Sequence, residues 1–156
     1  MDNYEVIIIG AGHAGIEAAL AASRMGCNTL LLTLSKQTIG ALSCNPAIGG
    51  VGKGQLVKEI DALGGEMGKL ADICGIQFRI LNSSKGAAVW SSRAQIDMEL
   101  YKKSAQEILF KQANLKIKEA LVDRLIVRDN LIIGVATNQD SEFFAKSLVI
   151  CPGTFL

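Results

Sequence analysis

The chain has 156 residues, of which 49% are hydrophobic and only 5% aromatic, and its formal net charge is +1. A chain of this length is ordinarily one domain with a sizeable core. The near-neutral charge argues against a dedicated nucleic-acid-binding domain, which would carry a strong basic excess, but it leaves room for a local basic patch. Sixteen glycines and two prolines are typical of an α/β enzyme rather than of a disordered or collagen-like chain.

Neither a secretory signal nor a membrane span is predicted, because the acidic start of the chain precedes only a short apolar run. The chain has a single histidine, and its cysteines stand far apart, at Cys27, Cys44, Cys74 and Cys151. This spacing does not match a zinc site, so we expect no metal. We expect four free thiols in a reducing, cytoplasmic compartment.

The first thirty residues predict a βαβ unit. Val6–Ile9 is a short, β-branched, wholly apolar run, which is typical of a central parallel strand buried on both faces. An alanine-rich helix is expected from His13 to Met25, closed by Gly26. Thr29–Thr33 is predicted to be a second buried strand.

A G-x-G-x-x-G motif joins the first predicted strand to the helix, which is the context that dinucleotide binding requires. Gly10 permits the tight turn, Gly12 lets the backbone approach a pyrophosphate, and Gly15 lets helix and strand pack closely. The motif predicts a dinucleotide site formed by Gly10, Ala11, Gly12, His13, Ala14 and Gly15.

The acidic residue that usually follows the second strand and binds the ribose is missing. Thr33, Leu34 and Ser35 stand there instead. Either Thr33 or Ser35 contacts the ribose, or another segment does.

The segment from Ser43 to Gly54 crowds four glycines around Cys44 and Lys53. Glycines let backbone N–H groups approach a bulky ligand. A thiol beside such a surface indicates a reactive cysteine rather than one that only packs. The other interpretation is a flexible loop with a buried structural cysteine.

The region from Ser35 to Ser92 is predicted to be partly irregular, with short helices at Gln55–Leu63 and Glu66–Ile73. Among its scattered basic residues, Lys53 and Lys85 are the better candidates for anion contact, and the rest are mostly expected to be solvated. Trp90 either stacks on a base or ring or belongs to a core or interface.

A long helix with one apolar stripe is expected from Arg93 to Gln112. Short strands follow at Leu115–Ile117, Leu121–Val127, Leu131–Thr137 and Lys146–Cys151. Asp129-Asn130 is predicted to be a hairpin turn. The last strand runs into a turn at Pro152-Gly153 just before the sequence ends, which indicates a partial domain.

Several motifs of the chain resemble one family. They are Gly10–Gly15, Ser43–Gly50, Lys53-Gly54, Glu59–Gly65, Gly75–Arg79, Leu81-Asn82, Lys85-Gly86, Arg93–Gln95 and Gly153–Leu156. Together they resemble the N-terminal part of the MnmG (GidA) family, the flavoprotein subunit of the tRNA wobble-uridine carboxymethylaminomethyl-modifying enzyme. The string Ser-Cys-Asn-Pro-Ala-Ile-Gly-Gly is the most specific of them.

The resemblance implies an α/β fold: a Rossmann-like FAD-binding domain with a parallel sheet, helices and a small antiparallel β-meander, truncated. Residues 1–156 would be the N-terminal part of that domain, with Val122 contacting the adenine through its backbone. The resemblance also implies FAD as cofactor and NADH as reductant. The region that binds NADH in the family would lie outside this chain. Cys44 would be the catalytic residue, as nucleophile or acid/base, or would only position the isoalloxazine.

The implied partners are tRNA, an MnmE-type GTPase, and a second copy of the chain within a heterotetramer. The one-carbon donor would be methylene-tetrahydrofolate. One departure from the family is Ala87, where proline is usual, and it should alter loop rigidity more than chemistry. Three alternatives are a generic FAD-dependent oxidoreductase, the related folate-dependent tRNA methyltransferase, and a non-catalytic FAD-binding remnant.

Overall fold

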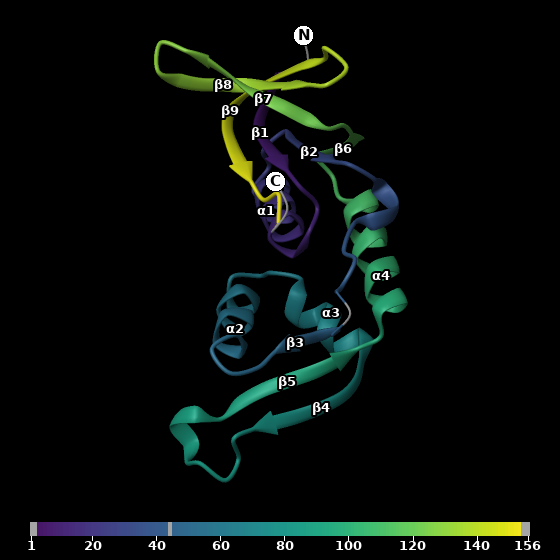
Figure 1. The fold of residues 1–156 in the computed structure, drawn as a ribbon, viewed down its shortest axis with the longest axis vertical. Helices are drawn as coiled ribbons and strands as arrows, with labels where there is room; N and C mark the ends of the chain where they lie inside the picture. The colour runs from purple at the N-terminus through teal and green to yellow at the C-terminus, as the bar shows by residue number, and fades with distance from the viewer. Residues whose placement is uncertain (1–2, 44, 154–156) are drawn as a thin grey trace. The chain divides into compact units, whose positions relative to one another are not determined.

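The computed structural model describes residues 3–43 and 45–153 (Figure 1). The chain divides into two compact units. The first unit combines Met1–Gly40 with Gln106–Leu156, and the second is Ala41–Ala105. In sequence, the second unit is therefore inserted into the first.

The first unit is built on a six-stranded sheet with the strand order β6-β2-β1-β9-β8-β7. Its strands are β1 (Asn3–Ile9), β2 (Thr29–Thr33), β6 (Leu115–Glu119), β7 (Val122–Arg128), β8 (Leu131–Thr137) and β9 (Glu142–Ile150). β6, β2, β1 and β9 pair in parallel, whereas β8 is antiparallel to both β7 and β9. The predicted fold class, a parallel sheet with an antiparallel meander, is confirmed.

The predicted βαβ unit is also confirmed. β2 has the expected bounds, β1 begins three residues earlier than expected, and α1 is His13–Arg24. Gly26 ends the helix with a φ of +90°, and its N–H donates to the carbonyl oxygen of Ser23. All five residues of β2 are buried, as expected for a central parallel strand.

The core of the first unit joins the parallel strands to the antiparallel ones. A single cluster of buried side chains contains Tyr4, Ile7, Leu30, Leu32, Val135 and Phe143. Burying large aliphatic and aromatic side chains is the main stabilising contribution to such a sheet. The cluster therefore fixes the meander on the parallel strands.

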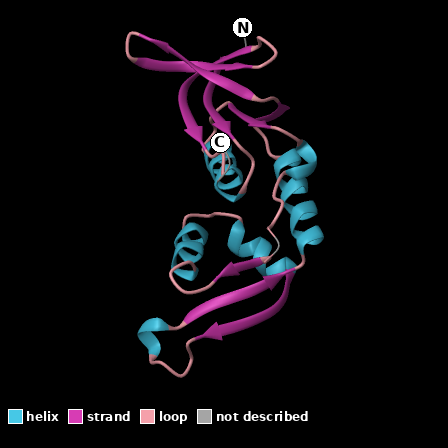
Figure 2. Cartoon of the chain, viewed as in Figure 1, coloured by secondary structure: helices cyan, strands magenta, loops and turns pink. Residues whose placement is uncertain are grey.

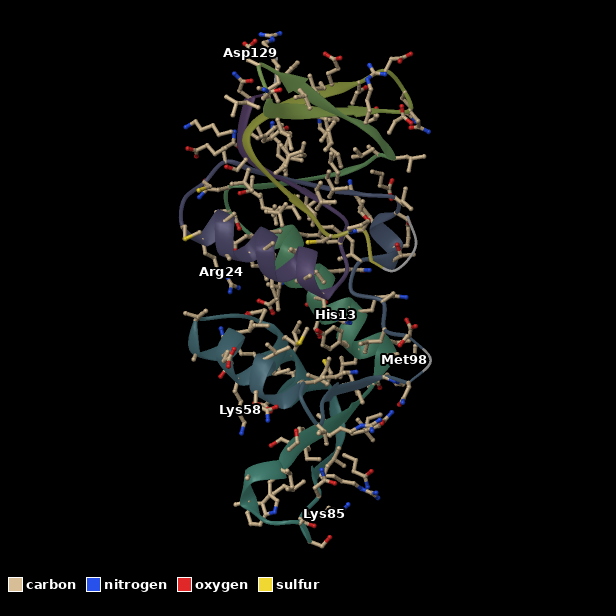
Figure 3. The ribbon with its side chains drawn as sticks, turned by 60° about the vertical axis from the view of Figure 1, so that its left-hand side comes forward. His13, Arg24, Lys58, Lys85, Met98 and Asp129 are labelled. Carbon is tan, nitrogen blue, oxygen red and sulfur yellow. The ribbon has the colours of Figure 1, made fainter. Side chains whose placement is uncertain are left out.

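The predicted turn between β7 and β8 is confirmed. Asp129 and Asn130 have φ values of 51° and 60°, as a type I′ turn requires. Figure 3 shows Asp129 at this end of the hairpin. The last strand, β9, begins at Glu142 rather than at Lys146, because its first residues pair with β8.

The second unit contains a three-stranded antiparallel sheet with the order β3-β5-β4 and two short helices (Figure 2). Its strands are β3 (Ala47–Gly49), β4 (Gly75–Leu81) and β5 (Ser91–Ile96), and its helices are α2 (Gly54–Ala62) and α3 (Met67–Cys74). Both helices were expected within one residue of these bounds. The strands were not expected, because this region was predicted to be partly irregular.

The predicted helix from Arg93 to Gln112 is wrong at its start. Arg93 to Ile96 form the end of β5, and the helix α4 is Met98–Lys111. The side chains of Ala94 and Ile96 are buried and those of Arg93 and Gln95 are partly exposed, which is the alternation of a strand. Pairing with β3 and β4 stabilises this strand over helix.

The expected apolar stripe of α4 is present, since Tyr101, Ala105 and Leu109 are each at most 2% exposed. Leu100, the apolar residue before Tyr101, lies outside this buried stripe and is 42% exposed. No helix among the described residues is long and apolar enough to cross a membrane.

Candidate functional site

The glycine turn after β1 is shaped by close backbone contacts. Gly10 has a φ of +98°, and a Cβ on it would come within 2.1 Å of the carbonyl oxygen of Cys151. A Cβ on Gly15 would come within 1.8 Å of the carbonyl oxygen of Gly10. Neither position admits a side chain, so β1, α1 and the end of β9 approach as closely as a dinucleotide-binding turn requires.

Gly12 has the opposite environment. A Cβ on it would meet nothing within 4 Å, and it precedes α1 with extended backbone and no side-chain cap. The first turn of α1 contains no acidic residue. The N–H groups at this helix end therefore face an open approach, which is suited to an anion such as a pyrophosphate.

A cavity of about 600 Å³ lies at the carboxyl ends of β1, β2 and β9, beside the start of β7. Ligands of open parallel sheets bind at this end of the strands. The cavity is lined by Ile9, Gly10, Ala11, Gly12, Leu32, Thr33, Leu34, Thr38, Ala120, Leu121, Val122, Asp123, Arg124, Leu125, Ile150, Cys151, Pro152 and Gly153.

Of the predicted cofactor-binding residues, the structure brings Gly10, Ala11, Gly12 and Val122 to the lining of this cavity. His13, Ala14 and Gly15 form the first turn of α1, directly after the lining residues. Figure 3 shows His13 at that end of the helix. Asp123 and Arg124 also line the cavity and were not predicted from the sequence. Their position directly after Val122 was the available signal.

Thr33 and Ser35, the two candidates to contact the ribose in place of the missing acidic residue, have different positions. Thr33 is buried at the end of β2 and lines the cavity, and its hydroxyl donates to the carbonyl oxygen of Ser35 at 3.2 Å. Ser35 is outside the lining, and its hydroxyl accepts a hydrogen bond from the N–H of Gln37 at 3.2 Å. The geometry favours Thr33 of the two.

The loop after β2 is held in place from several sides. The Nε2 of Gln106 donates to the carbonyl oxygens of Lys36, Gln37 and Ile39 at 3.2, 3.2 and 3.3 Å. The Glu119 carboxylate accepts the N–H of Lys36 at 2.6 Å. The N–H of Gly40 donates to the carbonyl oxygen of Ala11, so the loop is also joined to the glycine turn. These bonds fix the rim of the cavity that includes Thr38.

The imidazole of His13 is partly buried, and this burial lowers its pKa below the usual 6.5, whereas the negative charge of Glu17 opposes the shift. His13 is therefore largely neutral at pH 7. A neutral imidazole can donate through one ring nitrogen and accept through the other.

Cys44, the predicted catalytic residue, lies outside the described residues. The rest of its glycine-rich segment forms β3, a turn and the start of α2. Gly49, Gly50 and Gly52 have φ values of 85°, 106° and 72°, and the N–H of Gly50 donates to the carbonyl oxygen of Ser92 at 2.8 Å. This part of the segment is built into the second unit rather than being a loose loop.

A second cavity, of about 480 Å³, lies within the second unit, bordered by its two helices and three strands. It is lined by Ile48, Gly49, Gly54, Val57, Lys58, Asp61, Gly68, Ala71, Asp72, Phe78, Arg79, Ile80, Ser92, Arg93 and Ala94.

Cys27, Cys74 and Cys151 are free thiols, as expected for these three. Within the residues that the structure describes, no group of three His, Cys, Asp or Glu side chains could hold a metal ion.

Comparison with known proteins gives consistent matches. The family model "Glucose inhibited division protein A" matches residues 5–156. The tRNA uridine 5-carboxymethylaminomethyl modification enzyme MnmG of Campylobacter fetus is 56% identical over 99% of this chain and 25% of its own length. The chain thus spans about a quarter of the length of this relative.

Comparison with solved structures gives a match to the same family. The structure of Aquifex aeolicus GidA matches 99% of this chain and 26% of its own, with a TM-score of 0.95 and 53% identity. PqsL of Pseudomonas aeruginosa, described as a probable FAD-dependent monooxygenase, matches 94% of this chain and 42% of its own with a TM-score of 0.65. At 16% identity, that likeness shows the fold alone. The extent of the family match, together with the glycine turn and the sheet, shows that this chain belongs to the glucose inhibited division protein A (MnmG/GidA) family.

Proposed function

We propose that the chain is the FAD-binding part of a tRNA-modifying flavoenzyme, with residues 1–156 forming the N-terminal portion of its FAD-binding domain. The observation that carries the proposal is the cavity at the carboxyl ends of β1, β2 and β9, where Gly10, Gly12 and Val122 meet. The relative at 56% identity is named a tRNA uridine 5-carboxymethylaminomethyl modification enzyme.

The donors of this cavity fit FAD. The N–H groups at the start of α1 would hold the pyrophosphate, and the absence of a Cβ at Gly12 leaves space for it. Thr33, at the end of β2, would contact the ribose. Val122 would contact the adenine through its backbone at the start of β7.

FAD, when bound, supplies two-electron redox chemistry and carries the one-carbon unit. The residues of this chain bind and orient it. Cys44 is the proposed catalytic residue: as a thiolate it would add to the uridine ring and activate the neighbouring carbon, which is a form of covalent catalysis. The other proposed role for Cys44 is to position the isoalloxazine.

The family membership supports a wobble uridine of tRNA as the substrate and methylene-tetrahydrofolate as the one-carbon donor, with glycine or ammonium supplying the nitrogen. NADH would reduce the flavin, bound outside residues 1–156. An MnmE-type GTPase would be the partner. The flavoprotein would be a homodimer within a heterotetramer, located in the cytoplasm.

Two measurements on the full natural chain test this proposal. The purified protein should show flavin absorption, and a strain lacking the gene should lose the carboxymethylaminomethyl or aminomethyl group from its wobble uridines, as read by mass spectrometry of tRNA nucleosides. Complementation with Cys44→Ser should leave the modification absent. Normal modification in the Cys44→Ser strain would exclude the catalytic role of this cysteine.

The same measurements separate the alternatives. A flavin-containing protein whose loss leaves tRNA nucleosides unchanged would be a generic FAD-dependent oxidoreductase, a class that shares this fold. A protein without flavin would be a non-catalytic remnant. Loss of a methyl group from tRNA, instead of the larger group, would identify the folate-dependent methyltransferase.

A further inference from the structure

The hairpin formed by β4, the 3₁₀ turn η2 (Ala87–Val89) and β5 carries charged side chains of positive sign only. Gly75–Ile96 contains Arg79, Lys85 and Arg93 but neither aspartate nor glutamate, whereas the whole chain has 16 basic and 15 acidic residues. The acidic residues of this unit lie elsewhere, for example on α2 and α3. Figure 3 shows Lys85 at the far end of this hairpin.

Two of these cations lie directly opposite each other across the sheet. Arg79 of β4 pairs in register with Arg93 of β5, and the next rung on the same face pairs Gln77 with Gln95. Directly opposed residues have their Cβ atoms about 4.5–5.5 Å apart, and like charges in such a pair destabilise the sheet. Because the two guanidinium groups repel each other, an anion that binds between them would stabilise the pair.

The arginine pair is oriented and accessible. The Nη2 of Arg93 donates to the Oδ1 of Asn45 at 3.1 Å, which holds that side chain beside the segment following Cys44. Arg79 is exposed, and within the described residues its guanidinium has no ion-pair partner. Both arginines also border the 480 Å³ cavity, so they adjoin open space.

The hairpin also exposes two aromatic rings. Phe78 is 58% exposed on β4, and Trp90, which follows η2, is 49% exposed. Cations interleaved with exposed aromatic side chains are typical of surfaces that bind single-stranded nucleic acid, where bases stack on the rings and phosphates contact the cations.

We propose that the hairpin Gly75–Ile96 binds the RNA substrate: Arg79, Lys85 and Arg93 contact its phosphodiester backbone, and Trp90 stacks on an unpaired base. The proposal deepens the proposed function and rests on it for the identity of the RNA. It assigns to the second unit a role in substrate binding that is separate from the cofactor cavity of the first unit.

The test measures tRNA binding to the FAD-loaded protein with its full natural chain, by filter binding between 50 and 200 mM salt. Arg79→Gln and Lys85→Gln should each weaken binding about fivefold at 0.1 M salt, and each should reduce the slope of log K against log salt by about 0.8, the value for one lost phosphate contact. Arg128→Gln, an exposed arginine on β7 of the other unit, is the matched control and should change neither quantity.

Trp90→Ala should weaken binding about tenfold without changing the salt slope, because stacking releases no counterions. The tRNA-induced change in tryptophan fluorescence should lose its Trp90 component in Trp90→Phe. Flavin absorption in each variant shows that the protein is folded, and Lys85→Gln at the hairpin tip covers the case in which Arg79→Gln does not fold.

Three results would overturn the proposal. If the wild-type protein binds tRNA and both cation variants keep its affinity and salt slope, the hairpin is not the RNA surface, although the proposed function stands. If Arg79→Gln and Arg128→Gln weaken binding equally, the effect is only one of net charge. If the wild-type, FAD-loaded protein binds no tRNA, the proposed function itself fails.

Discussion

A Cβ on Gly15 would come within 1.8 Å of the carbonyl oxygen of Gly10. The first turn of α1 is therefore in direct backbone contact with the turn that ends β1. Gly12, between them in the sequence, has no atom within 4 Å of its Cβ position. Two glycines of the same motif thus serve different purposes: Gly15 serves packing, and Gly12 leaves room for a ligand.

This contrast gives a first prediction. Gly15→Ala should lower the free energy of unfolding by about 3 kcal/mol or prevent folding, because the helix must move off the strand. Gly12→Ala should change stability by only about 0.5 kcal/mol, since its backbone suits any residue, yet weaken FAD binding at least about tenfold. Thermal unfolding and flavin titration measure the two effects. A Gly12→Ala protein with normal FAD affinity would mean that the pyrophosphate does not approach this glycine.

The second prediction concerns the loop after β2. Gln106→Met removes the amide that donates to three carbonyl oxygens of Lys36–Ile39, so the rim of the 600 Å³ cavity should loosen. We expect a stability loss of about 1 kcal/mol and a several-fold weaker FAD affinity, with faster hydrogen exchange at the N–H of Gly40. Gln112→Met is the control, because the hydrogen bonds of that amide, to the carbonyl oxygen of Ala113 and from the Nε of Arg24, do not involve the loop. Equal exchange in the two variants would show that Gln106 does not hold the loop.

The third prediction follows from the lowered pKa of His13. The unfolded chain takes up a proton near pH 6.5, but the buried imidazole does so only at lower pH. The unfolded state therefore binds more protons in this window, and the contribution of His13 to stability, complete above pH 6.5, is lost as the pH falls to the folded-state pKa. The slope is at most about 1.4 kcal/mol per pH unit.

The measurement for His13 is the free energy of unfolding from pH 5 to 8 in wild type and in His13→Gln. Subtracting the two curves removes the contributions of other titrating groups. The difference should be flat above pH 7 and fall on acidification below it. A difference that instead rises as the pH falls would mean that the folded state holds the imidazolium more tightly than the unfolded chain does.

The sequence predicted the first unit better than the second for physical reasons. β2 is a continuous apolar run, and α1 is an alanine-rich helix bounded by glycines. In both elements the local sequence pattern agrees with the packing in the folded unit. Asp123 and Arg124 reach the 600 Å³ cavity because β7 pairs with β8, which in turn pairs with β9 of the parallel strands. Their position directly after Val122 was the one local signal for this placement. The catalytic role of Cys44 is implied by the family resemblance alone and stays a prediction.

In the second unit, β4 and β5 were missed because their stability comes from each other. Gly75–Leu81 is mostly exposed on both faces, so its apolar side chains do not face a buried core. The alternation of apolar and polar residues in Ile76–Ile80 was the available strand signal. Arg93 to Ile96 were assigned to the following helix because they join its apolar pattern without a glycine or proline between. The signal that could have separated them is Asp97, a residue favoured at helix N-caps.

Asp97 also provides the last prediction. Its Oδ1 accepts the N–H of Leu100 at 3.0 Å, and its carbonyl oxygen accepts the N–H of Tyr101, so it caps α4 where the strand ends. Asp97→Ala should lower the free energy of unfolding by about 1 kcal/mol, and Asp97→Ser should restore most of it, because a serine hydroxyl can accept the same bond. Glu107→Ala, an exposed carboxylate on the same helix, is the control for lost charge and should have little effect. Equal destabilisation by Asp97→Ala and Asp97→Ser would show that the side-chain cap does not define the boundary between β5 and α4.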